Sequence, residues 1–419
     1  MCREAQDKRC EAQLHRAACK LHMKGSEWAK ALEAVRASYS LTKALGDKQE
    51  EARLLSSAVQ LHLAMGEMDE AFVAAGQLTA LCQAEGDRHQ EAWALLKTGI
   101  VQGLRQELGA AMSAAREALE HFIAIGDRSG EGRALHLIAD LCQVKGDSAA
   151  GLQEAGKMRD IFREMGCWTM QAQALRMMAE MQLADGNPKQ SERLAAEALA
   201  LARKEGDRRM EVQLLLLSSQ GSVASITKEA LAAENASKVL RRLDEKALKP
   251  AEEALRLSQK LKDQSLEAAA LHAVGSVQLA ALRGSEAVAA SLKAATLFEA
   301  CNDQRGQVAN EMLRAQALFL QEDSPGAMDL LEKTTLPLAS SIGDKHGESL
   351  AKQLLEQMRS HKAGPAPAKV ATVSAVAETA APAAEAAPQS AGLDVAMLEK
   401  MIRETAANAV GGEEEIQLD

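Results

Sequence analysis

The chain has 419 residues, of which 47% are hydrophobic but only 2% are aromatic, and its formal net charge is -10. An acidic chain is a poor general partner for nucleic acid, because phosphate binding requires a basic surface. Few aromatic residues beside abundant Ala, Leu, Glu and Gln argue against sheets, so we expect an all-α protein with closely packed helices.

The first residues, MCREAQDKRCEAQ, are charged from the third position and contain no apolar core of a signal peptide. No stretch approaches the roughly 20 apolar residues that span a bilayer. Seven scattered cysteines include no C-x-x-C pair, which is typical of reduced thiols. We therefore expect a cytoplasmic protein with no membrane contact.

Turn signals recur along the chain at an interval of about 40 residues, which lies within the range of helical repeat proteins. Gly-Asp pairs stand at 46/47, 86/87, 126/127 and 206/207, Gly166-Cys167 fills the missing place, and the series extends to Asp7, Asp263, Asp303 and Asp344. A second glycine lies about halfway through several units, at Gly25, Gly66, Gly146 and Gly186. Gly in the left-handed conformation ends a helix and Asp caps the next, so each unit is predicted to hold two helices of roughly 15 to 17 residues.

Aligning the units on the Asp produces two regular columns. Eight residues on stands leucine, at Leu55, Leu95, Leu135, Leu175, Leu215 and Leu271. Four residues later the column is mostly small, with Cys19, Val59, Gly99, Ala139, Ala179, Ser219, Gly275 and Ala315. This spacing places both columns on one stripe of the helix, which indicates a face for close helix packing.

These columns resemble a tetratricopeptide-repeat array over residues 7 to 343. Leu stands where that family often has Trp, and a small residue opens the second helix, at Ala71, Ala111, Gly151, Ser191, Ala287 and Ala327. The usual unit has about 34 residues, so this chain is similar to the longer-helix variants. The resemblance implies a right-handed α-solenoid over residues 1–361, with eight helix pairs and a closing helix near 345–361.

One unit is longer than the others, because the interval from Asp207 to Asp263 exceeds the interval between the earlier repeat aspartates. The insertion falls at about 220–247 and contains a predicted helix near 226–243 and a basic run from Lys238 to Lys249. A lengthened helix pair is the simpler interpretation. A dedicated binding elaboration is the alternative.

Residues 362–392 are rich in Ala and Pro and cannot form a packed core, which predicts a disordered linker. Residues 393–419 then begin with Asp394 as a helix cap, followed by an apolar stripe and Gly411-Gly412; the stripe comprises Val395, Leu398, Met401, Ile402 and Thr405. This segment resembles the opening of an acyl-carrier domain of polyketide and nonribosomal synthases, although the Asp-Ser-Leu motif of that family is not reached. Because Asp7 also starts in mid-register, one hypothesis is a piece of a larger assembly-line protein.

No catalytic motif is present: the chain lacks G-x-x-x-x-G-K-[ST], H-E-x-x-H and G-x-S-x-G. We expect neither catalysis nor a cofactor. The side chains of His15, Cys19 and His22 lie on one face of a helix and are of types that bind zinc. His15 and Cys19 occupy core columns, however, so we expect them to pack in the core and not to form a metal site. His136 and His272 share a column, nine residues past the Asp, and are predicted to be surface imidazoles in a groove.

In the family that this chain resembles, side chains of the first helices line a concave groove. The corresponding positions lie six, nine, thirteen and sixteen residues past each Asp, and they hold Arg16, Lys20, Arg53, Trp93, Arg133, His136, Asp140, Arg176 and Glu180. Five cations and one Trp predict a groove for an extended or helical peptide with acidic residues, anchored on Trp93. The alternative is that these side chains are solvated and bind nothing.

Together these features favour a non-catalytic scaffold for protein–protein interaction. A ligand-sensing regulatory repeat domain is an alternative, as is the assembly-line piece. The first repeat has no preceding cap and is expected to expose Leu14, Ala17, Ala18 and Leu21 in part, which predicts possible self-association.

Overall fold

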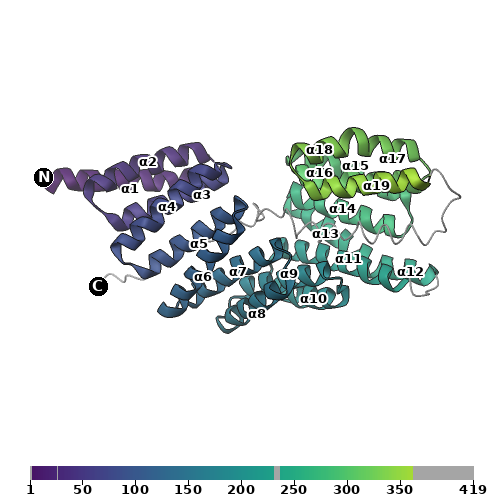
Figure 1. Ribbon diagram of the computed structural model, residues 1–419, viewed down its shortest axis with the longest axis horizontal. Coiled ribbons are helices and arrows are strands. Elements are labelled where there is room, and N and C mark those ends of the chain that lie inside the picture. The colour runs from purple at the N-terminus through teal and green to yellow at the C-terminus, as the bar shows by residue number, and fades with distance from the viewer. Residues whose placement is uncertain (1, 26, 231–235, 362–419) are drawn as a thin grey trace. The chain divides into compact units, whose positions relative to one another are not determined.

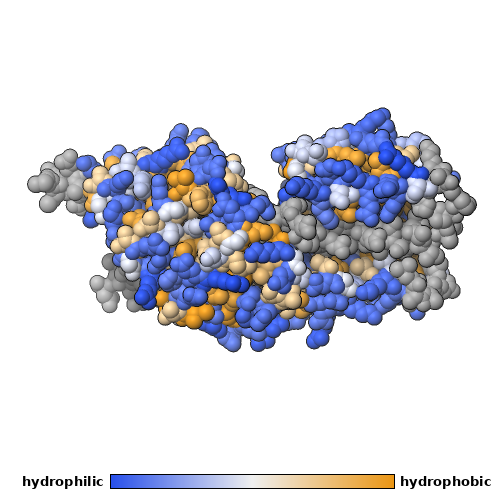
Figure 2. All heavy atoms as spheres, in the orientation of Figure 1, coloured by the Kyte–Doolittle hydropathy of each residue, from blue (hydrophilic) through white to orange (hydrophobic). Residues whose placement is uncertain are grey.

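The computed structural model describes residues 2–25, 27–230 and 236–361, and these residues form helices and short turns with no strand among them (Figure 1). They divide within α7 into two compact units, residues 2–141 and 142–361. The predicted linker at 362–392 and the predicted helix within 393–419 lie outside the described residues. Polar side chains predominate on the visible face of the units, with apolar side chains in smaller patches (Figure 2).

Unit 1 contains three complete helix pairs and most of a seventh helix. The pairs are α1 (Cys2–Lys24) with α2 (Trp28–Leu45), α3 (Lys48–Ala64) with α4 (Met68–Glu85), and α5 (Arg88–Leu104) with α6 (Leu108–Ile125), followed by α7 (Arg128–Val144). Each helix up to α6 packs against its neighbours along the chain. The odd-numbered helices of unit 1, α1, α3, α5 and α7, are the first helices of the predicted repeats.

Unit 2 continues the alternation. It contains α8 (Ser148–Glu164), α9 (Trp168–Ala184), α10 (Pro188–Glu205), α11 (Arg208–Ala230), α12 (Ala236–Leu243), α13 (Lys249–Leu261), α14 (Gln264–Ala280), α15 (Gly284–Ala300), α16 (Gln304–Leu320), α17 (Ser324–Leu330), α18 (Leu336–Ser341) and α19 (Lys345–His361). Short π-helical segments join α12 to α13 and α17 to α18. Each joined pair therefore serves as the second helix of one repeat. The predicted eight pairs and closing helix are confirmed.

The predicted caps position the first helices. Carboxylate oxygens of the repeat aspartates accept hydrogen bonds from backbone N–H groups two or three residues on, as at Asp47, Asp87, Asp263 and Asp303. The first unit departs from this pattern, because α1 begins at Cys2 and Asp7 lies inside it. Gly25 also differs: it does not adopt the left-handed conformation of the other turn glycines.

The two predicted columns form the core. Every member of the leucine column is buried, and so is every member of the small column. The small column permits close approach: a Cβ atom added at Gly99 would lie 3.1 Å from Leu137 Cδ2 on α7 and 3.2 Å from the Ala111 carbonyl oxygen on α6. The repeat interval therefore brings bulky aliphatic side chains against positions that have little or no side chain.

Two second helices contain π-helical segments, Asp244–Leu248 and Leu331–Thr335, which the sequence analysis missed. Each is followed within two residues by a proline, Pro250 or Pro337. Proline has no N–H to donate to the carbonyl four residues earlier, and a π segment shifts the local hydrogen-bond register to five residues. Within the first of these segments, the Ala247 oxygen also accepts a hydrogen bond from Ser219 Oγ on α11 at 2.9 Å.

The insertion lengthens a helix pair. Residues 226–230 belong to α11 and α12 begins at Ala236, so the helix predicted over 226–243 is instead divided between two elements of the described chain. Val223 and Ile226 of α11 pack in one hydrophobic cluster with Leu243 and Ala247. Among the described residues, no helix combines the length and apolarity needed to cross a membrane.

Replacement of a column leucine tests this core. Leu135 is 2% exposed, so Leu135→Ala is expected to lower the free energy of unfolding by about 2 to 5 kcal/mol. Leu292 is 50% exposed on α15, and Leu292→Ala is expected to cost below about 0.5 kcal/mol. Urea unfolding followed by circular dichroism measures both, and equal losses would contradict the assignment of the column to the core.

The close approach at Gly99 predicts a specific coupling. Gly99→Ala is expected to cost about 1 to 3 kcal/mol through overpacking, and Leu137→Val in the same chain should recover part of that loss. Gly86→Ala is a matched control, because an added Cβ meets nothing within 4 Å there and the cost of about 1 kcal/mol comes from the backbone conformation alone. Leu137→Val should not relieve Gly86→Ala, so additive effects at Gly99 would refute the contact.

Candidate ligand-binding face

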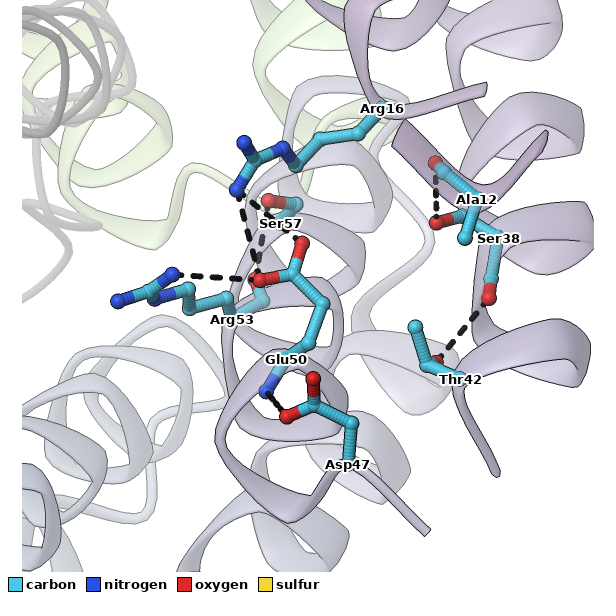
Figure 3. A network of polar contacts seen from close by, with 8 residues as sticks. All are labelled: Ala12, Arg16, Ser38, Thr42, Asp47, Glu50, Arg53 and Ser57. Carbon is cyan, nitrogen blue, oxygen red and sulfur yellow. Dashed lines mark hydrogen bonds and ion pairs between the residues drawn. The ribbon is translucent and has the colours of Figure 1, made fainter. Parts of the chain in front are cut away.

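The first helices of unit 1 are connected by polar contacts on one face, beginning with α1 and α3. Arg16 Nη1 donates to Glu50 Oε1 at 3.2 Å, and Arg53 Nη1 donates to Glu50 Oε2 at 3.3 Å (Figure 3). Asp47 accepts a hydrogen bond from the Glu50 backbone N–H and thereby fixes the start of α3. One carboxylate thus pairs with two of the predicted groove cations.

Lys97 on α5 is the next cation along this face, and it differs from the two arginines. Its ammonium donates a hydrogen bond to the hydroxyl of Ser56 on α3, and within the described residues it forms no ion pair with a carboxylate. Burial, together with the nearby positive charge of Arg133, lowers the pKa of Lys97 to about 8. A partly buried ammonium with no carboxylate beside it is unfavourable by itself.

Arg133 on α7 lies on the same face and is only 6% exposed. Its guanidinium carbon is 5.8 Å from the centre of the Trp93 ring, within the range of a cation–π contact. Trp93 packs edge-on against Phe122 with the ring centres 5.0 Å apart, and its Nε1 donates to His89 Nε2 at 3.3 Å. Like Lys97, Arg133 forms no ion pair within the part of the chain that the structure describes.

We name Ser56, Trp93, Lys97 and Arg133 the cation cluster. Its members come from three consecutive first helices, α3, α5 and α7, and all lie in unit 1. Two neighbouring cations without a carboxylate, beside an indole ring, form an environment that favours an anion.

The remaining predicted groove residues have different surroundings. Lys20 is exposed on α1. Asp140 lies one turn after His136 on α7, with Oδ2 3.7 Å from His136 Nε2. Arg176 and Glu180 form an ion pair on α9, in unit 2.

The prediction of a surface imidazole was wrong for His136. His136 is 1% exposed. His272 is half-buried, and removal of its imidazole from water lowers the pKa of that imidazole, with a hydrogen bond to Asn310 acting in the opposite direction. The column nine past the Asp also contains Leu96, Leu216 and Met312. Three of its eight members are thus apolar, which was a signal in the sequence that the column is not uniformly exposed, and the groove assignment did not use it.

Among the possible zinc ligands of α1, Cys19 packs in the core. Cys19 lies in a hydrophobic cluster with Leu54 and Leu61, and burial raises the pKa of its thiol to about 11. His22 Nδ1 instead lies 2.6 Å from Glu27 Oε2. Across the described residues, no group of three or more His, Cys, Asp or Glu side chains is placed to hold a metal ion.

Sequence reasoning missed Lys97, although the repeat alignment contained a signal. Lys97 stands ten residues past Asp87, in a column where other units place Leu137, Met177, Leu217 and Leu313, all of which are buried. The other members of this column are small or apolar, so a lysine there is a break in the pattern that marks an unusual position.

Comparisons with known proteins place the fold. No protein-family model matches the chain, and no curated protein sequence matches it. A signal-transduction ATPase with a tetratricopeptide-repeat sensor from Pyrococcus horikoshii is 12% identical, with a TM-score of 0.52 over 84% of this chain and 51% of that one. Aspartyl phosphate phosphatase F from Bacillus subtilis is 12% identical, with a TM-score of 0.50 over 85% of this chain and 96% of that one.

A Rap protein in complex with Competence and Sporulation Factor is also 12% identical, with a TM-score of 0.46 over 86% of this chain and 99% of that one. The chain has the fold of a tetratricopeptide-type repeat protein. At this level of identity the likeness concerns the fold alone, so the chemistry of the cation cluster rests on this chain's own residues.

The lowered pKa of His272, whose half-buried imidazole is partly removed from water, predicts a pH dependence of stability. Because its folded-state pKa lies below the ordinary value of 6.5, its contribution is fully present above that value and is lost as the pH falls below it. The stability of the wild type relative to His272→Gln should therefore decrease from about pH 8 to about pH 5 in urea unfolding. A difference between the two proteins that stays constant with pH would contradict a lowered pKa of His272.

Proposed function

We propose that this protein is an interaction scaffold whose first-helix face in unit 1 binds a peptide segment with acidic residues. The observation that supports this most directly is the cation cluster, where Lys97 and Arg133 stand together without a carboxylate. Charge-assisted hydrogen bonds to a ligand carboxylate would compensate both cations, and such bonds contribute more than neutral ones.

The surrounding residues fit a peptide better than a free ion. Trp93 provides an apolar surface beside the two cations, and aromatic side chains with arginine commonly dominate the energy of peptide binding. Arg16, Arg53 and exposed Lys20 extend the positive character of the face along α1 and α3, although Glu50 already pairs with the two arginines. We therefore assign the principal anchor to the cation cluster and a weaker, longer-range attraction to the other cations.

The assignment of the remaining groove residues to ligand binding stays a hypothesis; they are His136, Asp140, Arg176 and Glu180. Because His136 is buried and Arg176 pairs with Glu180, a structural role is favoured for these residues over contact with a ligand. The ligand-sensing and assembly-line alternatives also stay hypotheses, and the residues that prompted the second of them, 393–419, lie outside the described chain.

Neutral replacements in the cation cluster test the proposal. Trp28→Phe and Trp168→Phe leave Trp93 as the single fluorescent indole, which is then titrated with a synthetic Glu-rich peptide containing leucine. Lys97→Met and Arg133→Met are each expected to weaken binding about tenfold or more, equivalent to about 1.4 kcal/mol. Lys157→Met on α8 removes the same charge from an exposed pair with Glu154 and should have little effect.

Binding is also expected to depend on pH with a definite sign. A ligand carboxylate stabilises the ammonium form of Lys97, so affinity should be constant below about pH 8 and should decrease above it. Lys97→Arg keeps its charge over this range and should remove the decrease. Unchanged affinity in both methionine variants, with a detectable peptide signal, would refute the cation cluster as the anchor.

A further inference from the structure

The neighbours of Lys97 in the cation cluster make its amine a nucleophile. Its nitrogen is hydrogen-bonded to the hydroxyl of Ser56 on α3, which can donate to a neutral amine as well as accept from an ammonium. Burial, together with the positive charge of Arg133 on α7, lowers the pKa of Lys97 to about 8. Removal from water and a nearby cation are the two features that activate lysine in this way. A sizeable fraction of Lys97 therefore carries a free lone pair at slightly alkaline pH.

The same cluster contains donors for a negative charge that forms at this nitrogen. Arg133 is only 6% exposed, and no carboxylate of the described chain pairs with it. Its guanidinium has N–H groups in a planar fork that matches the two oxygens of a carboxylate group. The hydroxyl of Ser56 is a further donor, already in contact with the lysine nitrogen. An anion attached to Lys97 itself would thus have both a cation and an O–H donor beside it.

We propose that Lys97 is a site of reversible modification by carbon dioxide, where a carbamate forms on Nζ and is stabilised by Arg133 and Ser56. The lone pair of the neutral amine attacks the carbon of CO2, a C–N bond forms, and one C=O electron pair moves onto oxygen. One N–H proton then leaves to water. The product bears a carboxylate group on Nζ, and no reactant other than CO2 is required.

The charges of the cluster favour this product. Before the reaction the Lys97 ammonium and the Arg133 guanidinium repel each other, and neither has a carboxylate partner among the described residues. After the reaction the two side chains attract each other and form charge-assisted hydrogen bonds, which are stronger than neutral ones. Lys97 is only half-buried, so dissolved CO2 has access to the nitrogen. The modification therefore compensates charges that are otherwise buried at a cost.

Other lysines of the array have surroundings that oppose a carbamate. Lys48 Nζ lies 3.0 Å from Glu51 Oε1, and Lys157 Nζ lies 2.9 Å from Glu154 Oε1. A carbamate at either position would stand beside a carboxylate of the same charge, which is unfavourable. These two lysines are matched controls for the reaction at Lys97.

The modification would also regulate the proposed peptide site. A ligand carboxylate would meet a carbamate in place of an ammonium, so CO2 should weaken binding of an acidic peptide. This consequence rests on the proposed function, whereas the modification itself does not.

Chemical trapping tests the modification in the full chain. The protein is equilibrated with carbon-13-labelled bicarbonate and CO2 at slightly alkaline pH and is then alkylated with triethyloxonium, which converts a carbamate into a stable ethyl carbamate. Peptide mapping by mass spectrometry should find this group on Lys97 at an occupancy about tenfold or more above that of Lys48 and Lys157. A carbamate carbon resonance should also appear in the wild type and be absent from Lys97→Arg. No adduct on Lys97, or equal occupancy at the three lysines, would overturn the proposal.

Cyanate separates the reactivity of the amine from the stabilisation of the product. It also adds to a neutral amine, but the urea that it forms is uncharged. Relative to the rate of the cyanate reaction, Lys97 occupancy by CO2 should decrease about tenfold in Arg133→Met and about threefold in Ser56→Ala. Circular dichroism checks that both variants keep their helices. Equal decreases with the two reagents would refute the stabilising roles of Arg133 and Ser56.

Peptide titration in buffer freed of CO2 distinguishes this proposal from the proposed function. Trapping on Lys97 without binding of the Glu-rich peptide would refute the peptide site and leave the modification supported. Peptide binding without a trapped carbamate would do the reverse. Where both are observed, CO2 should weaken peptide binding to the wild type and leave binding to Lys97→Arg unchanged. Equal peptide affinity with and without CO2, while Lys97 is modified, would overturn the regulation.

Discussion

Close contact between consecutive first helices is the constraint on which the array depends. Leu137 Cδ2 comes within 3.1 Å of the place where a Cβ of Gly99 would stand, and Leu313 Cδ2 comes within 3.0 Å of the corresponding place at Gly275. No larger side chain fits without displacing its neighbour, so the small column determines how near one repeat lies to the next. The fixed repeat interval follows, because a leucine reaches its small partner only when both helices and both turns keep their lengths.

This packing is strong enough to overrule the local preferences of the turns. Gly supplies the left-handed residue at most of them, but Gln106, Lys262, Leu282, Asn302 and Glu322 adopt the same conformation without being glycine. Each such residue carries a backbone cost of about 1 kcal/mol or more. The turn geometry is therefore imposed by the packed helices, and glycine is the residue that adopts it most easily.

The fold was predictable from sequence because its determinants are periodic. The repeat aspartates, the leucines and the small residues each recur, and eight aligned copies outweigh the weakness of any one motif. The candidate site was predicted less well because its determinants break the period. Lys97 was missed as the exception in a column of small or apolar residues, and His136 is a buried member of a column that elsewhere holds arginine, serine and leucine. The π segments before Pro250 and Pro337 likewise concern single units, so alignment of the repeats does not reveal them.

The presence of a carboxylate partner distinguishes cations that stabilise the array from cations that are candidates for ligand binding. Arg203 bridges Glu211 and Glu253, and Arg283 pairs with Asp244 through two hydrogen bonds of 2.8 Å, so these side chains join different helical segments within unit 2. Their desolvation is compensated within the described chain. Arg133 is only 6% exposed, against 45% for the side chain of Arg203, and Lys97 is half-buried, yet neither has a carboxylate partner among the described residues. For Lys97 this burial is unfavourable for stability, because other units place leucine in the same column. This uncompensated burial is the physical ground on which the proposed binding role of the cation cluster rests.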